Sequence, residues 1–525
     1  MREGSIVINV SIQPSRWRLG LSVVASAALM LAVTSCSSGS TEAGSAVATA
    51  PVRIAVASPI ESLSPDQSFL LVEYGMAELL ARPAPDGTVT GWLAQSIIPS
   101  EDLKTWSITL NSGVTFHNGS PVDGKAVAAA LQRTIAQQQR YFLGATVEAT
   151  GELEVTIVLP QPNSTVRNIL ASRYNFPIYD ANALPADLTD AKAIAAAGVY
   201  TGPFIPDPPT TAGLTARANP DYWQGEVEVG GLQLQFVEDP QARVAAVEAG
   251  EVYIAMQAPA EAALTIAKRD EVVFVTAQTG PLARVLLPHV TTPPLDDPLV
   301  RRAISYAIDY QALADEVLAG AYEPASGLYS SGISYGKQNY AHDPGRAAAL
   351  LDDAGWRPDG GLRTKGGQPL ALRYIFEQAD LDSEAIGIGL KAMLANVGID
   401  LELQAIESFY APEAFPAVWH LALRSAQTQG VDNSPVEGID YLLGETYGIG
   451  EVNDPDVQRF VNSYLGTVDE AEHARLLGEL QDVVLDRGLA FVVGFEYPKV
   501  VTTRQWATFK PTYSAPVIWY DIAPA

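Results

Sequence analysis

Few side chains of this chain have the types and spacing that chemistry requires. Metal-binding histidines usually come in closely spaced pairs or beside cysteines. The five histidines are instead isolated from one another along the sequence: His117, His289, His342, His420 and His473. The only cysteine is Cys36, so the sequence offers neither an internal disulfide nor a thiolate metal cluster. We therefore expect no resident metal or other cofactor, and a metal could reach this protein only as a preformed chelate.

One motif points to hydrolysis. Gly332–Gly336 (GISYG) fits the G-x-S-x-G pattern, in which Ser334 would be the nucleophile. That pattern requires a buried strand immediately before the serine and a helix immediately after it. The preceding residues are small and turn-forming, and the next helix signal comes only at Asp343. A serine hydrolase is therefore a remote alternative, and we predict that the protein is not an enzyme.

The N-terminal 35 residues have the composition of a signal peptide. Arg16 and Arg18 precede an uncharged apolar run, Leu19–Val33, which is shorter than the roughly 20 residues that a membrane-spanning helix needs. Val33–Cys36 (VTSC) then resembles the lipobox of bacterial lipoproteins. The resemblance implies cleavage before Cys36 and attachment of diacylglycerol to this cysteine. An ordinary secretory signal with an incidental cysteine is the alternative.

The tether and the charge of the chain indicate its compartment. Residues 36–50 are small and polar and predict a flexible tether between a lipid anchor and the folded part. The formal net charge of −27 at pH 7 repels nucleic acid and anionic lipid, so neither is an expected partner. We predict a protein held by its lipid anchor on the extracytoplasmic face of the cell membrane.

Strand and helix signals alternate along the rest of the chain, which predicts an α/β protein. Residues 52–56, 105–110 and 153–159 have the pattern of strands. Asp123 is a candidate N-cap for a helix over residues 125–138. A chain of 525 residues is too long for one hydrophobic core, and no 20–50-residue period repeats, which excludes a solenoid or a propeller.

The second half carries clearer helix boundaries. Residues 299–319 place apolar side chains at helical spacing, with Asp309 as the cap of a second helix inside this range. Asp343 and Pro344 predict the start of a further helix, which Gly355 ends. Two more elements are predicted downstream, a helix over residues 384–396 and a half-buried strand over residues 399–403.

Six short blocks of the sequence resemble the motifs of one protein family and occur in the same order. The most specific block is Asn219–Gly225 (NPDYWQG), which is close to the pattern N-P-x-Y-W-G-G. The others are Gly91–Ala94 with Val114–Pro121, Thr201–Phe204, Glu248–Val252, Leu299–Asp309 and Asp343–Gly355. In this order they resemble the peptide/nickel class of ABC-transporter solute-binding proteins, family 5. The resemblance runs from about residue 52 to the C-terminus.

This resemblance implies a fold and a function. The fold is a two-lobed periplasmic-binding-protein type II clamp with an extra inserted domain (class C), and a small-molecule ligand binds in the cleft between the lobes. Family members include dipeptide-, oligopeptide- and nickel-binding proteins, which deliver their ligand to the permease subunits of an ABC importer. We expect a monomer that uses desolvation, hydrogen bonding and hinge closure, with no covalent chemistry.

The expected domains are discontinuous in sequence. They are a signal peptide (1–35), a lipidated tether (36–50), a first-lobe core (51–80, 200–278 and 487–525), a smaller domain inserted into that lobe (81–199) and a second lobe (280–486). Within these domains, most residues of the six blocks are expected to stabilise the fold and not to contact the ligand. Tyr222 and Trp223 carry large apolar area and are expected in a core. His117 lies beside a turn and is expected to be a hydrogen-bonded structural histidine.

Peptide-binding members of the family place an aspartate from a G-D-x-x-D-P loop against the α-ammonium group of the ligand. The similar stretch here is Gly430–Pro435 (GVDNSP), in which Asp432 is the candidate ligand residue and Ser434 replaces the second acid. A desolvated carboxylate–ammonium pair would give both orientation and charge selection. The alternative is that Asp432 caps a solvated turn. This stretch favours a short peptide as the ligand.

The nickel-binding branch suggests other ligand residues. Its arginines clamp the carboxylates of an organic metal chelator, and Arg140 and Arg173 stand in the matching segments here. They could equally bind a peptide carboxylate or be surface arginines. His420 precedes Leu421–Arg424 where that branch has R-T-W-G, so the tryptophan of the branch is missing. We keep a metal chelate as the alternative ligand and His420 as a further candidate contact.

Overall fold

The computed structural model describes most of the chain after the predicted tether. The described residues are 50–67, 69–83, 88–137, 142, 144–172, 176–266, 268–277, 282–333, 335–378, 380–409, 415–427, 434–443, 452, 454–512 and 516–525. Cys36 and the predicted signal peptide lie outside them. Within the described part, no helix is both long enough and apolar enough to cross a membrane.

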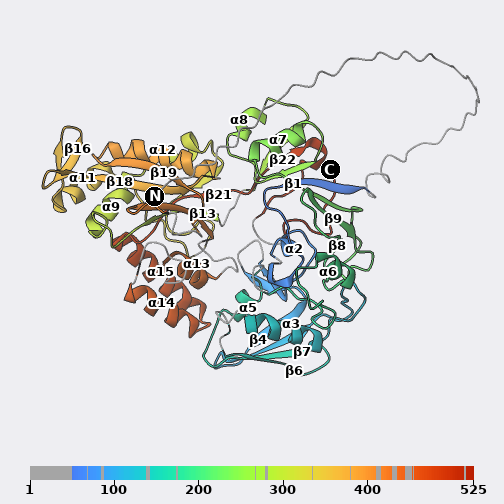
Figure 1. Cartoon of the computed structure of the whole chain (residues 1–525). Coiled ribbons are helices and arrows are strands. Elements are labelled where there is room, and N and C mark those ends of the chain that lie inside the picture. Colours follow the sequence, from blue (N-terminus) through green and yellow to red (C-terminus); the bar gives the residue numbers. More distant parts are fainter. Residues whose placement is uncertain are drawn as a thin grey trace, which may run out of the picture. The chain divides into compact units, whose positions relative to one another are not determined.

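The first of two large sheets combines strands from both ends of the described chain (Figure 1). Its strands are Pro51–Val56 (β1), Phe204–Pro206 (β8), Gly213–Ala218 (β9), Gly231–Phe236 (β10), Ile254–Met256 (β11), Val272–Thr276 (β12) and Lys499–Thr503 (β22). Their order in the sheet is β12-β22-β11-β1-β10-β9-β8. β1 lies parallel to β10 and β11, whereas the flanking strands pair antiparallel. The sheet is therefore complete only when β22 has folded onto β11.

The second large sheet has six strands. They are Leu282–Pro288 (β13), Tyr322–Pro324 (β14), Ala371–Glu377 (β18), Asp400–Ile406 (β19), Leu421–Gln427 (β20) and Phe491–Glu496 (β21). Their order is β14-β21-β13-β20-β18-β19. β18 and β19 are parallel, so their connection has to return along the sheet, and a helix fills it. The pairs that β13 forms with β20 and β21 are antiparallel.

The remaining strands form three smaller sheets. One has four antiparallel strands in the order β4-β5-β7-β6. The strands of all three are Ala81–Pro83 (β2) with Val89–Gly91 (β3); Ala94–Pro99 (β4), Thr105–Leu110 (β5), Thr146–Ala149 (β6) and Glu154–Val158 (β7); and Arg357–Asp359 (β15), Leu362–Lys365 (β16) and Gln368–Pro369 (β17).

Aspartate caps most of the longer helices. The capping carboxylates belong to Asp190, Asp239, Asp297, Asp309, Asp343, Asp380, Asp454 and Asp469. Each accepts a hydrogen bond from a backbone N–H of the first turn, which would otherwise lack a partner. The helices are Pro65–Gln67 (η1), Phe69–Glu73 (α2), Gly124–Gln137 (α3), Val166–Ile169 (α5), Ala191–Ala197 (α6), Pro240–Glu248 (α7), Ala262–Ile266 (α8), Pro298–Ala307 (α9), Tyr310–Ala312 (α10), Leu313–Val317 (η2), Pro344–Asp353 (α11), Leu381–Ala395 (α12), Pro435–Leu443 (α13), Pro455–Leu465 (α14), Glu470–Arg487 (α15) and Arg504–Trp506 (η4).

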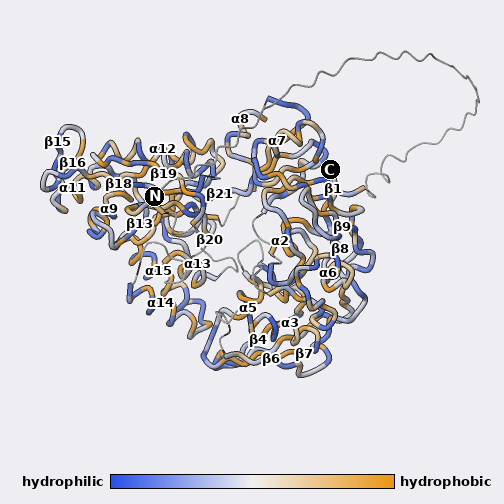
Figure 2. Tube along the Cα trace, in the orientation of Figure 1, coloured by the Kyte–Doolittle hydropathy of each residue, from blue (hydrophilic) through white to orange (hydrophobic). Residues whose placement is uncertain are grey.

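The two large sheets and the four-stranded sheet each have a hydrophobic core. The second large sheet packs with α9, α11, α12 and α15 around fully buried residues such as Ile304 and Leu390. Ile54 and Phe204 belong to the core of the first large sheet, and Trp106 belongs to the core that α3 forms with the four-stranded sheet. Figure 2 shows apolar and polar residues interleaved along the helices, which is the pattern of helices that bury one face.

The α/β prediction is confirmed, and several element boundaries agree closely with it. The strand predicted over 105–110 is β5, and the helix predicted after Asp123 is α3. The range 299–319 is divided as predicted, because α9 ends before Ile308 and Asp309 caps the next turn. The helix predicted over 384–396 begins earlier, at Leu381, because the side chain of Asp380 already caps its first turn.

The prediction that residues 487–525 lie wholly with the first lobe is wrong for β21. This strand pairs with β13 and β14 in the second large sheet. The chain returns to the first large sheet only between Glu496 and Lys499. All of β21 and nearly all of β22 is buried. Burial therefore carries no sign of which sheet each strand joins.

The block residues Tyr222, Trp223 and His117 have structural partners. The Tyr222 hydroxyl donates to the Glu78 carboxylate over 2.9 Å, and Trp223 Nε1 donates to it over 3.1 Å. Glu78 is fully buried, and this burial raises its pKa to about 7. His117 Nε2 lies 2.8 Å from the Gly202 carbonyl oxygen, so this nitrogen carries the proton. Burial lowers the pKa of His117 to about 4.

The Leu299–Asp309 block has a structural role through Arg301. Its buried guanidinium donates to the carbonyls of Leu295, Arg487 and Gly488, and the last two end α15. Arg301→Met should lower the free energy of unfolding by about 2 kcal/mol, because buried carbonyls lose their donors. The matched control is Arg302→Met, whose guanidinium lies 3.9 Å from an exposed carboxylate and should cost less than about 1 kcal/mol. Equal urea midpoints for the two variants would contradict this role.

Candidate ligand-binding site

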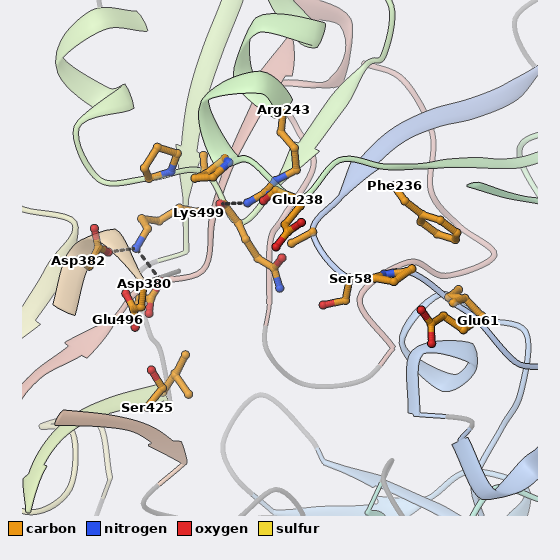
Figure 3. Close-up of a pocket in the computed structure, with 18 of the residues that line it drawn as sticks. Ser58, Glu61, Phe236, Glu238, Arg243, Asp380, Asp382, Ser425, Glu496 and Lys499 are labelled. Atoms are coloured by element: carbon orange, nitrogen blue, oxygen red, sulfur yellow. Dashed lines mark hydrogen bonds and ion pairs between the residues drawn. The ribbon is translucent and has the colours of Figure 1, made fainter. Parts of the chain in front are cut away.

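A cavity of about 1290 Å³ is lined by residues of both large sheets and their connections. Figure 3 shows its labelled residues: Ser58, Glu61, Phe236, Glu238 and Arg243 from the first-sheet part, Asp380, Asp382, Ser425 and Glu496 from the second-sheet part, and Lys499 at the start of β22. Cavities that bind small molecules usually measure roughly 300–1,000 Å³. This cavity is therefore large enough for a ligand bigger than a single amino acid.

One wall of the cavity is a network of charges, four of them buried and Asp380 half-buried, which we call the crossing cluster (Arg284, Asp380, Asp382, Glu496 and Lys499). Glu496 is its central member. Its Oε2 lies 2.9 Å from Nη2 of Arg284, and its Oε1 lies 2.6 Å from Nζ of Lys499. Lys499 Nζ also donates to Asp382 Oδ2 over 3.2 Å, and Arg284 Nη1 pairs with Asp380. The side chains of Arg284 and Lys499 are only 6% and 2% exposed.

Two neutral hydroxyl groups complete the crossing cluster. The Tyr322 hydroxyl accepts from Arg284 Nε over 3.1 Å and donates to Asp382 Oδ2 over 2.6 Å. Ser425 Oγ accepts a hydrogen bond from Arg284 Nη1. Burying charges is costly unless they are paired and hydrogen-bonded, and here each charged member of the cluster has at least one charged partner.

The crossing cluster lies where the chain passes between the two large sheets. Glu496 ends β21 in the second sheet and Lys499 begins β22 in the first, so only Tyr497 and Pro498 separate the sheets on this strand. The Ala277 N–H, just after β12, donates to the Pro498 carbonyl over 3.0 Å. The segments that leave β12 and β21 therefore run together at this point. Any movement of one sheet relative to the other would therefore bend the chain beside these charges.

Arg243 organises the first-sheet part of the cavity wall. Its guanidinium donates to four backbone carbonyls, those of Val237, Glu238, Met256 and Gln257. These carbonyls lie at the ends of β10 and β11, so Arg243 holds together the strand ends that line the cavity. Gln257 has a φ of +51°, a left-handed conformation that non-glycine residues adopt at a cost.

A smaller annex of about 110 Å³ adjoins the cavity and shares Asp380 and Ser425 with it. Arg424, Glu377 and Phe409 also line this annex. The Arg424 guanidinium lies 5.4 Å from the centre of the Phe409 ring, a favourable cation–π distance. The annex extends the cavity along the end of β20.

The predicted ligand residues are only partly described. Asp432, Arg140 and Arg173 lie outside the described residues, as does Ser334 of the hydrolase motif. Ser434 is 2% exposed and immediately precedes α13. Its carbonyl accepts a hydrogen bond from the N–H of Gly438, in the first turn of that helix. It is not among the described residues that line the cavity.

The structure places His420 at the far end of β20 from the cavity. Its Nδ1 accepts a hydrogen bond from the Arg373 N–H over 2.9 Å, and burial lowers its pKa. Ser425, which does line the cavity, is five residues further along the strand, or roughly 17 Å at 3.3–3.4 Å per residue. The hydrogen bond to His420 Nδ1 therefore links the start of β20 to β18 and does not involve the cavity.

Sequence reasoning missed the crossing cluster. Its members come from β13, the start of α12 and the two strands of the crossing, so no local pattern groups them. One signal was present. Glu496 and Lys499 are charges inside an otherwise apolar run, and buried charges of this kind usually have specific partners.

A further contact joins the segment after β7 to the second-sheet part. The Ser164 N–H donates to the Leu465 carbonyl, and Ser164 Oγ donates to the Tyr464 carbonyl, both over 3.0 Å. Both carbonyls lie at the C-terminal end of α14, and the Tyr464 carbonyl also lies 3.1 Å from Nε2 of His473. The His473 ring stacks on Tyr464 with ring centres 3.8 Å apart. Ser164 thus caps a helix that lies 300 residues away in sequence.

Two large sheets that are joined by crossing strands and share a charged cavity define a two-lobed solute-binding clamp. The chain belongs to the bacterial extracellular solute-binding proteins, family 5, because the model of this family matches residues 88–444. It is similar to the nickel-binding periplasmic protein of Escherichia coli K12, with 25% identity over 86% of this chain and 89% of that protein. It is also similar to the glutathione-binding protein GsiB of Salmonella paratyphi A, with 29% identity over 76% of this chain and 79% of that protein.

Solved structures have the same fold. NikA from Staphylococcus aureus in complex with Ni(L-His)2 matches with a TM-score of 0.75 and 19% identity, covering 91% of this chain and all of that one. A putative peptide-binding protein, AppA from Clostridium difficile, matches with a TM-score of 0.75 and 15% identity over the same shares. The predicted fold class and family are confirmed by these likenesses.

Proposed function

We propose that this family 5 solute-binding protein captures short peptides outside the membrane and delivers them to the permease of an ABC importer. The observation that carries the proposal is the cavity of about 1290 Å³, which exceeds the usual volume for a small-molecule ligand and has polar groups on two walls. A short peptide needs such a site because its main-chain and terminal groups must exchange water for protein partners. The ligand is bound and released unchanged.

The proposed site includes residues outside the described part. Asp432 would pair with the α-ammonium group of the peptide, and Arg140 or Arg173 would pair with its carboxylate. Ser434 and His420 are retained only as secondary candidates, because neither is among the described residues that line the cavity. A diacylglycerol on Cys36 would hold the protein at the membrane, where the importer is reached by diffusion in two dimensions.

Native mass spectrometry of the purified protein, isolated without unfolding, tests the proposal. We expect bound masses that form a ladder of short peptides. Asp432→Ala should then weaken peptide binding by about tenfold in calorimetry, because a desolvated ammonium group loses its counter-charge. A protein that carries no peptide and binds none from a defined peptide mixture would contradict the proposal.

A chelated metal is the second candidate. The similarity to a nickel-binding relative over 86% of the chain favours it. Among the described residues, no group of three or more His, Cys, Asp or Glu side chains is placed to hold a metal ion. The chelator would therefore have to supply metal ligands, with Arg140 and Arg173 holding its carboxylates. In the same mass spectra, a single adduct with a metal isotope pattern would select this candidate over the peptide.

A further inference from the structure

The described walls of the cavity hold more acidic than basic side chains. Three of the lining residues are basic and five are acidic, which leaves two negative charges in excess. The basic residues are Arg243, Arg284 and Lys499, and the acidic residues are Glu61, Glu238, Asp380, Asp382 and Glu496. In a cavity that closure shields from water, such an excess acts strongly on a charged ligand.

The three basic side chains are already committed to protein partners. Arg243 donates to four backbone carbonyls. Arg284 donates to Asp380, Glu496, Ser425 and Tyr322, and Lys499 donates to Asp382 and Glu496. An anionic group that entered this part of the cavity would have to compete with these carboxylates and carbonyls. The cost of exposing a buried carboxylate makes that exchange unfavourable.

Acceptor groups, by contrast, remain available on both walls. Asp382 is 8% exposed, and only its Oδ2 takes hydrogen bonds from described residues, so Oδ1 keeps its acceptor capacity. The carboxylates of Glu61 and Glu238, on the other wall, are exposed and have no hydrogen-bond or ion-pair partner among the described residues. These oxygens suit an ammonium or guanidinium group, which offers several donors and no acceptor.

We propose that the cavity selects solutes that carry a basic group, which lies between the crossing cluster and Glu238 and draws its affinity from this acidic excess. The inference rests on the proposed function only in taking the cavity as the ligand site. Its solute class is narrower than short peptides in general: peptides with a lysine or arginine side chain are preferred, and peptides with an acidic side chain are disfavoured. A basic solute that is not a peptide would fit the same walls.

The test uses three tripeptides of equal length: alanyl-lysyl-alanine, alanyl-glutaminyl-alanine and alanyl-glutamyl-alanine. Calorimetry at pH 7 should show the lysyl peptide binding at least about tenfold more tightly than the glutamyl peptide, with the glutaminyl peptide between them. Equal affinities, or tighter binding of the glutamyl peptide, would overturn the inference while leaving peptide capture intact. If none of the three binds, peptide capture is the proposal in doubt.

A second readout does not depend on peptides. Solute released from the purified protein by denaturation is passed over cation- and anion-exchange resins at pH 7. Retention on the cation exchanger supports the inference for any solute class, and retention on the anion exchanger alone contradicts it.

Substitutions can locate the effect on one wall. Glu238→Gln removes a charge without breaking any contact of the crossing cluster, and should weaken lysyl-peptide binding by about threefold, because the group is exposed. Glu251→Gln makes the same change of net charge on an exposed residue that does not line the cavity, and should change binding by less than about 1.5-fold. Equal effects of the two variants would mean that overall charge, and not this wall, attracts the solute.

Discussion

Arg284→Met is expected to lower the free energy of unfolding by about 3–5 kcal/mol, because it removes the buried cation that the buried Glu496 and the half-buried Asp380 share. Breaking a buried ion pair by removing one partner is far more costly than breaking a surface pair. The loss should appear as a lower urea midpoint with an unchanged slope, since the surface exposed on unfolding stays nearly the same.

Arg373→Met is the matched control for this prediction. Arg373 lies in the same sheet and pairs with Glu402 over 3.1 Å, but the two side chains are 31% and 62% exposed. The same substitution there should cost less than about 1 kcal/mol. If both variants lose equal stability, the crossing cluster is not the source of the effect.

The second large effect concerns the pH dependence of stability. Glu78 is fully buried with its pKa raised from 4.5 to about 7, so it stabilises the fold below pH 4.5 and loses this contribution as the pH rises through 7. His117 is buried with its pKa lowered from 6.5 to about 4, so its contribution is present above pH 6.5 and is lost as the pH falls through 4. Each shift corresponds to about 3 kcal/mol at 1.36 kcal/mol per unit.

The two contributions oppose each other, so their sum is nearly flat between about pH 4.5 and 6.5. Of these two contributions to the pH dependence of stability, only that of His117 remains in Glu78→Gln. The free energy of unfolding of this variant, relative to that of the wild type, should therefore rise by roughly 2–3 kcal/mol from pH 4.5 to 6.5. His117→Gln keeps a donor for the Gly202 carbonyl and should show the opposite trend over the same range. Urea unfolding at several pH values, followed by tryptophan fluorescence, measures both.

One result would contradict this account directly. If the stability of Glu78→Gln relative to the wild type does not change between pH 4.5 and 6.5, Glu78 does not take up a proton on folding in that range. The tryptophan signal is suitable because Trp92, Trp106 and Trp223 lie in the same part of the chain as Glu78 and His117.

Local rules predicted much of the fold. An Asp–Pro pair such as Asp343 and Pro344 supplies both an N-cap and a fixed first-turn dihedral, so its helix start could be placed to the residue. The pairing of strands could not be placed in this way. β21 and β22 are both short and almost entirely buried, and the sheet that each joins depends on partners about 170 residues or more earlier in the chain.

The candidate site was harder to predict than the fold. The family resemblance proposed Asp432, Arg140 and Arg173, and these stay predictions because they lie outside the described residues. The crossing cluster depends on Arg284, Asp380 and Glu496 meeting in space. An isolated arginine near the start of a strand has the same sequence signal whether it faces solvent or two carboxylates of its own chain. Only the assembled sheets therefore show the role of Arg284.

The Ser164 contact has a consequence for the lifetime of the bound state. If the lobes separate to release a solute, the two hydrogen bonds from Ser164 to the end of α14 must break first. Each contributes about 1 kcal/mol net, so together they can slow opening by roughly tenfold or more. A single serine that is not among the described residues lining the cavity would then set residence time, while the charged walls would determine the choice of solute.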